Sequence, residues 1–172
     1  VGAGRTATMR IVFGADVPER GLIFVSGRKT QIRSPKDAIR NRICLLTEDR
    51  KGQGLVLNHP VRENFGLPNL DRFARGPFLD KRREREEFAG YVESLNIKLA
   101  DQDQLAGDLS GGNQQKVVLA KWVARNADII IFDEPTRGID VGAKYEIYLL
   151  MNRLVHEGKA IIMISSELPE IL

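Results

Sequence analysis

The stretch that decides the fold is residues 109–135, with the sequence LSGGNQQKVVLAKWVARNADIIIFDEP. It opens with Ser110, Gly111 and Gly112, and the apolar residues that follow recur at helical spacing: Val118, Leu119, Trp122 and Val123. Serine is a good N-cap, glycines let backbone N–H groups approach a ligand closely, and a helix N-terminus favours anions. The pattern predicts a phosphate-binding helix start. The alternative is an ordinary Ser-Gly-Gly turn before a buried helix.

The apolar run 129–132 in the same stretch ends at two carboxylates, Asp133 and Glu134. Paired carboxylates just beyond a buried strand lose hydration, which is costly unless they hold a metal or carry out proton chemistry. In phosphoryl transfer the first would hold magnesium, and the second would orient the attacking water or accept its proton. A structural pair held by salt bridges is the alternative.

Two further apolar runs also stop at polar residues. Residues 43–46 precede Thr47 and Glu48, and residues 161–164 precede Ser165 and Ser166. Unbroken runs of this kind predict strands buried on both faces of a parallel sheet, whose ligands bind at the carboxyl ends of the strands. We therefore expect an α/β fold with a mainly parallel sheet and an active edge where these polar residues converge.

The rest of the chain predicts two additions to this core. Residues 22–30 form a small antiparallel hairpin that turns at Gly27. Residues 58–116 form a helical insertion, and residues 1–57 and 117–172 form the α/β core. Within the insertion, residues 81–87 contain two i,i+4 charge pairs, Arg82 with Glu86 and Arg83 with Glu87, which favours a solvated helix face over a binding patch.

Composition excludes several functional classes. The 172 residues carry 26 Lys and Arg against 23 Asp and Glu, and a net charge of +3 is too small to indicate nucleic-acid binding. No apolar stretch approaches the roughly 20 residues that cross a bilayer, so a membrane role requires a partner. Cys44 lies in an apolar run, which favours a buried, inert thiol in a reducing compartment. His59 and His156 have no neighbours at metal-ligand spacing, and we assign them no function.

The order Leu-Ser-Gly-Gly, then Asp-Glu-Pro-Thr after an apolar strand, then Gly138-Ile139-Asp140 resembles the ABC ATPases. The resemblance implies a P-loop NTPase (RecA-like) core with an inserted helical subdomain that ends in the Leu-Ser-Gly-Gly signature, and it implies ATP and Mg²⁺ as cofactors. Asp133 would bind magnesium, and Glu134 would be the general base. The signature-side contacts to the ATP held by a partner domain would come from Ser110, Gly111, Gly112, Gln114 and Asp140.

The first six residues are similar to the last part of a P-loop, although the first glycine of that pattern is absent. Gly2 and Gly4 would expose amides to the phosphates, and the Thr6 hydroxyl would bind magnesium. Arg5 stands where the family normally has lysine, and it keeps the charge without the compact ammonium. A Gly-Ala-Gly segment is by itself more typical of a flexible terminus.

Two further positions depart from the family pattern. Glu48 stands where a glutamine usually senses the γ-phosphate, so it adds negative charge unless magnesium, Arg50 or Lys51 offsets it. Ser166 stands at the switch-histidine position, and a hydroxyl cannot carry a proton's charge as imidazole does. Both catalytic positions are therefore expected to weaken the local site.

The segments 48–51, 109–116 and 165–167 together are similar to the second nucleotide-binding half of fused bacterial ATPases that import ribose, galactose or xylose. This resemblance implies an N-terminal nucleotide-binding domain in the same polypeptide, transmembrane permease subunits, and an indirect periplasmic or lipid-anchored sugar-binding protein. It places the chain at the cytoplasmic face of the membrane, without nucleic acid. We expect a truncated piece with a degenerate site of its own, which lends its signature helix to the other half. The alternatives are a non-transport ABC ATPase that acts on nucleic acid or ribosomes, and a purely regulatory half.

Overall fold

The computed structural model describes residues 4–170, which form two compact units. The first unit contains the residues up to Leu46, the segment Ala127–Pro135 and the residues from Ile147 onward. The second unit contains Thr47–Asn126 and Thr136–Glu146. The insertion predicted at residues 58–116 falls within the second unit.

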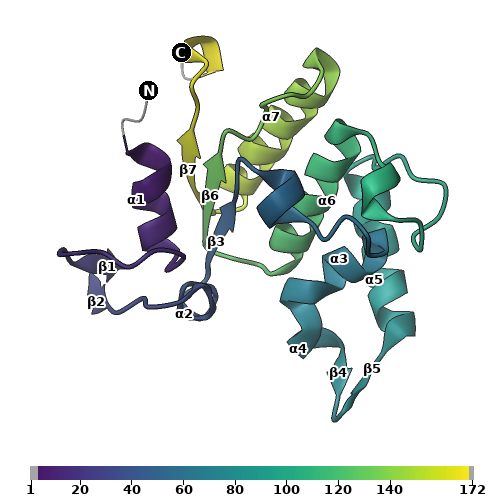
Figure 1. Cartoon of the computed structure of the whole chain (residues 1–172), viewed down its shortest axis with the longest axis horizontal. Coiled ribbons are helices and arrows are strands. Elements are labelled where there is room, and N and C mark those ends of the chain that lie inside the picture. Colours follow the sequence, from purple (N-terminus) through teal and green to yellow (C-terminus); the bar gives the residue numbers. More distant parts are fainter. Residues whose placement is uncertain (1–3, 171–172) are drawn as a thin grey trace. The chain divides into compact units, whose positions relative to one another are not determined.

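The first unit is built on a parallel sheet with the strand order β3-β6-β7 (Figure 1). The strands are β3 (Ile43–Leu46), β6 (Ile129–Asp133) and β7 (Ala160–Ile164), with Ile43 opposite Ile129 and Ile131 opposite Ile162. β3 is buried along its whole length, including Cys44, and β6 is buried from Ile130 onward. These runs confirm the predicted parallel sheet.

The prediction that all three strands are buried on both faces is wrong for β7. Its residues alternate between more and less exposed, and Ile162 is 39% exposed. β7 lies at one edge of the sheet formed by the described residues, but the fully buried β3 lies at the other, so position at an edge does not by itself account for the exposure of β7.

The remaining elements of the first unit include the predicted hairpin, β1 (Ile23–Val25) and β2 (Arg28–Thr30), which pair antiparallel. Ser26 and Gly27 between them both have positive φ, 51° and 76°, as a tight hairpin turn requires. The helices are α1 (Arg5–Val12), α2 (Pro35–Arg40), the short η4 (Leu168–Glu170) and the later part of α7 (Val141–His156). α2 begins where Ser34 accepts a hydrogen bond from the Asp37 amide and Pro35 fills the first turn.

The second unit is helical. It contains η1 (Arg50–Gly54, a π-helical turn), α3 (Val61–Gly66), η2 (Leu67–Asn69), α4 (Leu70–Phe73), α5 (Lys81–Ser94), η3 (Ala106–Asp108), α6 (Gly111–Ala124) and the start of α7. A two-stranded hairpin, β4 (Ala74–Arg75) and β5 (Phe78–Leu79), joins α4 to α5. α6 packs against η1, η2, α3 and α5, and its residues from Gln114 to Lys121 are all buried. α6 is therefore the core of this unit.

The charged face of α5 is ion-paired, as expected, but only one predicted pair forms. Arg82 Nε lies 2.7 Å from Glu86 Oε1. The predicted Arg83–Glu87 pair is wrong, because Glu87 binds Arg72 of α4 at 2.6 Å instead. An i,i+4 pattern cannot anticipate a competing cation from another helix.

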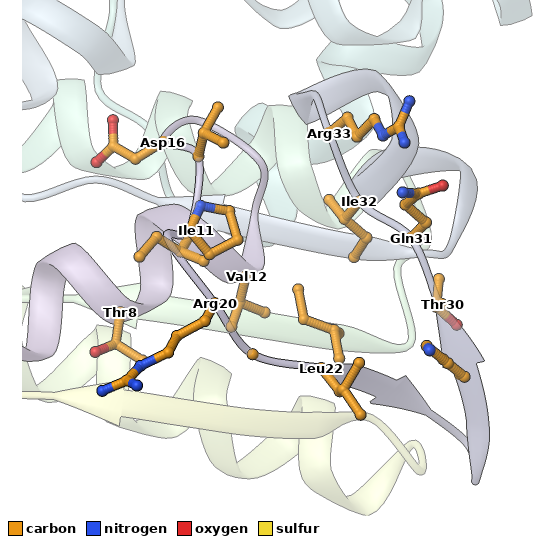
Figure 2. Close-up of a pocket in the computed structure, with 15 residues that line it drawn as sticks. Thr8, Ile11, Val12, Asp16, Arg20, Leu22, Thr30, Gln31, Ile32 and Arg33 are labelled. Carbon is orange, nitrogen blue, oxygen red and sulfur yellow. The ribbon is translucent and has the colours of Figure 1, made fainter.

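A pocket of about 880 Å³ opens in the first unit (Figure 2). Thr8, Ile11 and Val12 of α1 line one side and residues 30–33 line the other, with Leu22 between them. None of the described residues selected from the sequence as site candidates lines this pocket, so the candidate site lies elsewhere. No helix among residues 4–170 has the length and apolar character needed to cross a bilayer.

Candidate functional site

The first unit brings Thr6 and Asp133 together. Thr6 lies in the first turn of α1, Asp133 ends β6, and the Thr6 hydroxyl donates to Asp133 Oδ1 at 3.0 Å. Asp133 is only 2% exposed. Burial raises the pKa of its carboxyl above the ordinary value, the Thr6 hydrogen bond opposes that rise, and the Glu134 charge adds to it. Asp133 is therefore a buried carboxylate with one hydroxyl beside it, and both groups present oxygen atoms that could bind a cation.

Glu134 is held in a left-handed backbone conformation, with φ of 48°. Its amide donates to the Ile164 carbonyl at 2.9 Å, and its carboxylate accepts a 2.9 Å hydrogen bond from the Ser166 hydroxyl. A glutamate in this conformation stores strain of about 1–3 kcal/mol, and such strain is frequent at functional sites. Asp133, Glu134 and Ser166 thus follow the carboxyl ends of β6 and β7, with Thr6 of α1 bound to Asp133, which agrees with the predicted active edge for two of its three strands.

The Arg5 side chain binds the backbone at this edge of the sheet. Its Nη1 donates to the Ser165 carbonyl at 2.9 Å, which ties the start of α1 to the end of β7. Gly4 precedes it with φ of 70°, a conformation that glycine adopts at little cost. Gly2, the other predicted P-loop glycine, lies outside the described residues. Ser165 and Tyr148 both donate to the Glu170 carboxylate, which fixes the segment after β7.

The second unit contains the serine–glycine–glycine motif. Ser110 caps α6 as predicted, because its hydroxyl accepts from the Asn113 amide at 3.4 Å and from Asn113 Nδ2 at 3.0 Å. A cavity of about 310 Å³ opens at this helix start. The residues that line it are Asn96, Lys98, Ser110, Gly112, Asn113, Lys116, Asp140, Gly142, Ala143 and Glu146.

Asp140 faces this cavity and caps α7. Its Oδ1 accepts from the Ala143 amide at 2.9 Å, and this hydrogen bond holds the pKa of the carboxyl below its usual range. Gly112 lies close by, since a Cβ built there would be 3.7 Å from Asp140 Oδ2 and 3.4 Å from the Ala143 Cβ. The predicted residues Ser110, Gly112 and Asp140 are therefore neighbours in space.

Two other predicted residues of this motif lie differently. Gly111 does not line the cavity, and a Cβ there would lie 2.8 Å from Arg50 Nη2. Gln114 is 3% exposed and its side-chain amide donates to the Ala106 carbonyl at 3.1 Å. In this structure Gln114 anchors η3.

The cavity also contains charged residues that the sequence analysis did not select. Lys116 forms an ion pair with Glu146 and donates to the Asn96 carbonyl at 2.9 Å, and the Lys98 amide donates to Asn113 Oδ1 at 2.8 Å. Lys116 follows Ser110 by six residues, so it lies within two turns of the helix start, and that spacing is the signal that could have identified it. Nothing in the sequence pattern indicates Glu146.

The negative charge of Glu48 is offset by an ion pair that the sequence did not indicate. Its carboxylate pairs with Arg137, whereas Arg50 donates to the carbonyls of Arg137 at 2.9 Å and Gly138 at 3.4 Å. From the sequence, magnesium, Arg50 and Lys51 were the groups that could offset this charge, and Arg137 was not among them. The segment 48–50 is thus joined to the loop before Asp140 by three contacts.

A model of the ABC transporter family matches residues 1–137. The chain belongs to the ABC transporter family. It is 51% identical over all 172 residues to the ribose import ATP-binding protein RbsA of Bacillus subtilis. It is 54% identical over 173 aligned residues to the putative ribose/galactose/methyl galactoside import ATP-binding protein 1 of Burkholderia lata. The chain spans about a third of these relatives, 35% and 34% of their lengths.

Solved structures of ABC proteins share the fold. A dimeric ATP-binding cassette in a post-hydrolysis state bound to ADP and Pi superposes with a TM-score of 0.78 at 22% identity, covering 98% of this chain and 72% of that one. A bacterial Atm1-family ABC exporter with ATP bound gives 0.76 at 23% identity, covering 99% of this chain and 28% of the exporter. The resemblance to ABC ATPases and the α/β P-loop fold class are confirmed for this ABC transporter chain.

Proposed function

We propose that this chain is an ATP-binding and ATP-hydrolysing cassette that powers sugar import across the cell membrane. The observation that carries the proposal is the cavity of the second unit, where Ser110, Gly112 and Asp140 surround the N-terminus of α6. Exposed backbone N–H groups at a helix start are donors for phosphate oxygens. The relatives named above are import ATP-binding proteins, which favours import over action on nucleic acid or ribosomes.

The edge of the first unit fits Mg²⁺. Among the described residues no cluster of three or more His, Cys, Asp or Glu side chains could hold a metal ion. Magnesium in ATPases needs only one or two protein ligands, because phosphate oxygens and water complete its shell. Thr6 and the buried Asp133, joined by a 3.0 Å hydrogen bond, supply one hydroxyl and one carboxylate for this purpose. Bound Mg²⁺ would supply positive charge to the phosphate oxygens.

Glu134 would then orient the attacking water and accept its proton. Ser166 donates to Glu134 Oε2 and so holds one carboxylate oxygen, which leaves the other for water. The serine hydroxyl positions this base but cannot take over the proton as an imidazole would. This limits what the local site contributes to hydrolysis.

Arg5 limits the local site further. Its Nη1 donates to the Ser165 carbonyl at 2.9 Å, so fewer of its N–H donors are left for a phosphate. We infer a division of labour, in which the local site is degenerate and the helix start at Ser110–Gly112 completes the site of another cassette. In that arrangement Ser110, Gly112 and Asp140 contact the nucleotide held by the partner, while Gln114 and Gly111 support the helix start.

The partners that follow from this proposal are an N-terminal nucleotide-binding domain in the same polypeptide and transmembrane permease subunits. A periplasmic or lipid-anchored sugar-binding protein would act through the permease. The chain would work at the cytoplasmic face of the membrane, and its relatives point to a pentose or hexose as the cargo.

The division of labour is tested by ATP turnover of the complete ATPase. We expect Ser110→Ala to lower the rate at least tenfold, because a hydrogen bond from this hydroxyl to a charged phosphate would contribute about 1.5–3 kcal/mol. Ser94→Ala on α5 is the matched control and should leave the rate unchanged. We expect Glu134→Gln to lower the rate less than Ser110→Ala does. The reverse order would mean that the local site performs the chemistry and that the division of labour is wrong.

A further inference from the structure

Lys121 is a buried cation outside the candidate site. It lies on α6, three turns after the signature motif, and is 8% exposed. Its Nζ donates to the Gly54 carbonyl, and its own carbonyl accepts from Asn69 Nδ2 at 2.9 Å. Its ammonium lies 5.6 Å from the ring centroid of Trp122. A lysine this deeply buried is rare unless its charge has a specific partner.

The partner, Gly54, ends the π-helical turn η1. This turn packs tightly on α6, since a Cβ at Gly54 would lie 3.2 Å from Val118 Cγ2. Its remaining order comes from local hydrogen bonds, in which the Gln53 and Gly54 amides donate to the Asp49 carbonyl at 2.9 and 3.1 Å. π-helical turns are rare and frequently occur at functional positions. The bond from Lys121 is a charge-assisted one to the carbonyl at the end of this turn.

The other end of η1 is bonded to the loop that precedes Asp140, a residue that lines the cavity at the start of α6. Arg50, the first residue of η1, donates to the carbonyls of Arg137 and Gly138, three and two residues before Asp140. The Arg50 guanidinium also lies against Gly111 at the start of α6. A continuous set of hydrogen bonds therefore runs from Lys121 through η1 to the loop that bears Asp140.

We propose that Lys121 is a positioning residue, whose buried ammonium holds the Gly54 carbonyl and thereby fixes η1 and, through Arg50, the loop 137–140. The consequence for ATP turnover rests on the proposed function, whereas the fixing of η1 does not. α6 would then have two roles. Its start at Ser110 would face the phosphate, and Lys121 near its other end would hold η1, which in turn binds the loop before Asp140.

Because Lys121 titrates in an accessible pH range, its positioning role should depend measurably on pH. Burial alone lowers the pKa of Lys121 to about 8. The charged residues of the elements around it are directed elsewhere: Arg62 to Glu84, Lys116 to Glu146, Arg125 to Asp71, and Arg50 to the loop carbonyls, while Lys51 is exposed. As the pH rises through 8, the ammonium loses its charge and its bond to Gly54 weakens.

A rise in pH weakens the bond between Lys121 and Gly54, but its effect on global stability has the opposite sign. Because the unfolded lysine keeps its ordinary pKa of 10.5, the unfolded state binds more protons between pH 8 and 10.5, so the contribution of Lys121 to stability rises with pH. A residue that only stabilised the fold would change local order and global stability in the same direction. A positioning residue with a lowered pKa changes them in opposite directions.

Hydrogen–deuterium exchange of the complete ATPase tests the proposal without any assay of activity. Amides of residues 53–55 are the probes, with rates corrected for intrinsic exchange at pH 7 and pH 9. In the unmodified protein we expect their protection to fall about fivefold between these values. Lys121→Met should show the lowered protection already at pH 7, and Lys121→Arg, which keeps its charge, should keep full protection at both values. Lys51→Met on the same turn is the matched control and should behave as the unmodified protein.

Two results would overturn the proposal. The first is unchanged protection of residues 53–55 in Lys121→Met. The second is a loss that extends equally to the central amides of α6, because that would show general destabilisation. If exchange behaves as expected but Lys121→Met and Lys121→Arg have the same ATP turnover and the same pH profile as the unmodified protein, the fixing of η1 stands and its link to the proposed function fails.

Discussion

Asp133 combines two properties that oppose each other. It lies at the end of a buried strand, where burial raises the pKa of its carboxyl, and it keeps one hydrogen bond from Thr6. An ionised carboxylate here lowers the stability of the chain without a bound cation, yet it is the group that a cation requires. The proposed magnesium site therefore reduces stability in the absence of its ligand.

This residue gives a prediction with a defined pH dependence. We expect Asp133→Asn to raise the free energy of unfolding of the purified chain by about 1 kcal/mol at pH 7. The folded pKa is raised, so the folded state loses stability as pH rises above the unfolded value of 3.8, and the gain from Asn should shrink toward pH 4. Thermal unfolding of the variant and the unmodified chain at the two pH values measures this gain.

Asp16→Asn is the control of opposite sign. Its hydrogen bond from Arg10 lowers the pKa of the Asp16 carboxyl, so this substitution should not stabilise the chain. A lower melting temperature for Asp133→Asn at pH 7 would contradict the account of the site.

The helix α5 carries one buried and one exposed ion pair. Glu84 and its partner Arg62 of α3 are both buried, 5% and 6% exposed, and Arg62 also binds Asp103. A Cβ at Gly66 would lie 1.9 Å from Glu84 Oε1, so the carboxylate occupies space that only a glycine leaves open. Glu84 lies on α5 only two residues from both Arg82 and Glu86, which form an exposed pair.

The two pairs on α5 predict very different costs. Glu84→Ala leaves Arg62 buried with only its bond to Asp103, and we expect a loss of about 3–5 kcal/mol in the free energy of unfolding. Glu86→Ala removes an exposed i,i+4 pair on the same helix, and we expect about 0.5 kcal/mol or less. Chemical denaturation of both variants measures the difference. Equal losses would show that burial does not decide the energy of these pairs.

How far the sequence predicts these elements depends on where their determinants lie. Apolar runs and a tight turn predicted β3, β6, β7 and the hairpin, because those patterns are local. The π-helical turn η1 was not predicted, since its end is held by Lys121, 67 residues away in the chain. The same holds for the site: the motifs predicted Asp133, Glu134, Ser110 and Asp140, while contacts such as Glu48 with Arg137 depend on tertiary structure.

For the molecule as a whole, the two sets of site residues fall in separate compact units. Thr6, Asp133, Glu134 and Ser166 belong to the first unit, and the cavity with Ser110 and Asp140 belongs to the second. In the proposed function each set supplies groups that the other lacks: the first would provide the metal ligands and the base, and the second would provide helix-start donors. A complete site of the proposed kind needs both kinds of groups around one nucleotide.

This separation predicts the activity of the purified 172-residue chain. We expect its ATP turnover to be at least a hundredfold below that of the complete ATPase, because neither set of groups makes a complete site alone and the Ser166 hydroxyl beside Glu134 cannot carry a proton's charge as an imidazole would. Phosphate release at matched cassette concentrations measures it. Substantial turnover by the chain alone, abolished by Glu134→Gln, would contradict this prediction and show a working local site.

The left-handed backbone at Glu134 also restricts which side chains position 134 can accept. A φ of 48° excludes β-branched residues for steric reasons, so Val, Ile or Thr would deform the turn after β6 as well as remove the carboxylate. Asn and Gly adopt this conformation more readily than Glu does, and either would relax the turn. Gln keeps the length and backbone preference of Glu, so it is the replacement that separates the loss of a base from a change in the shape of the chain.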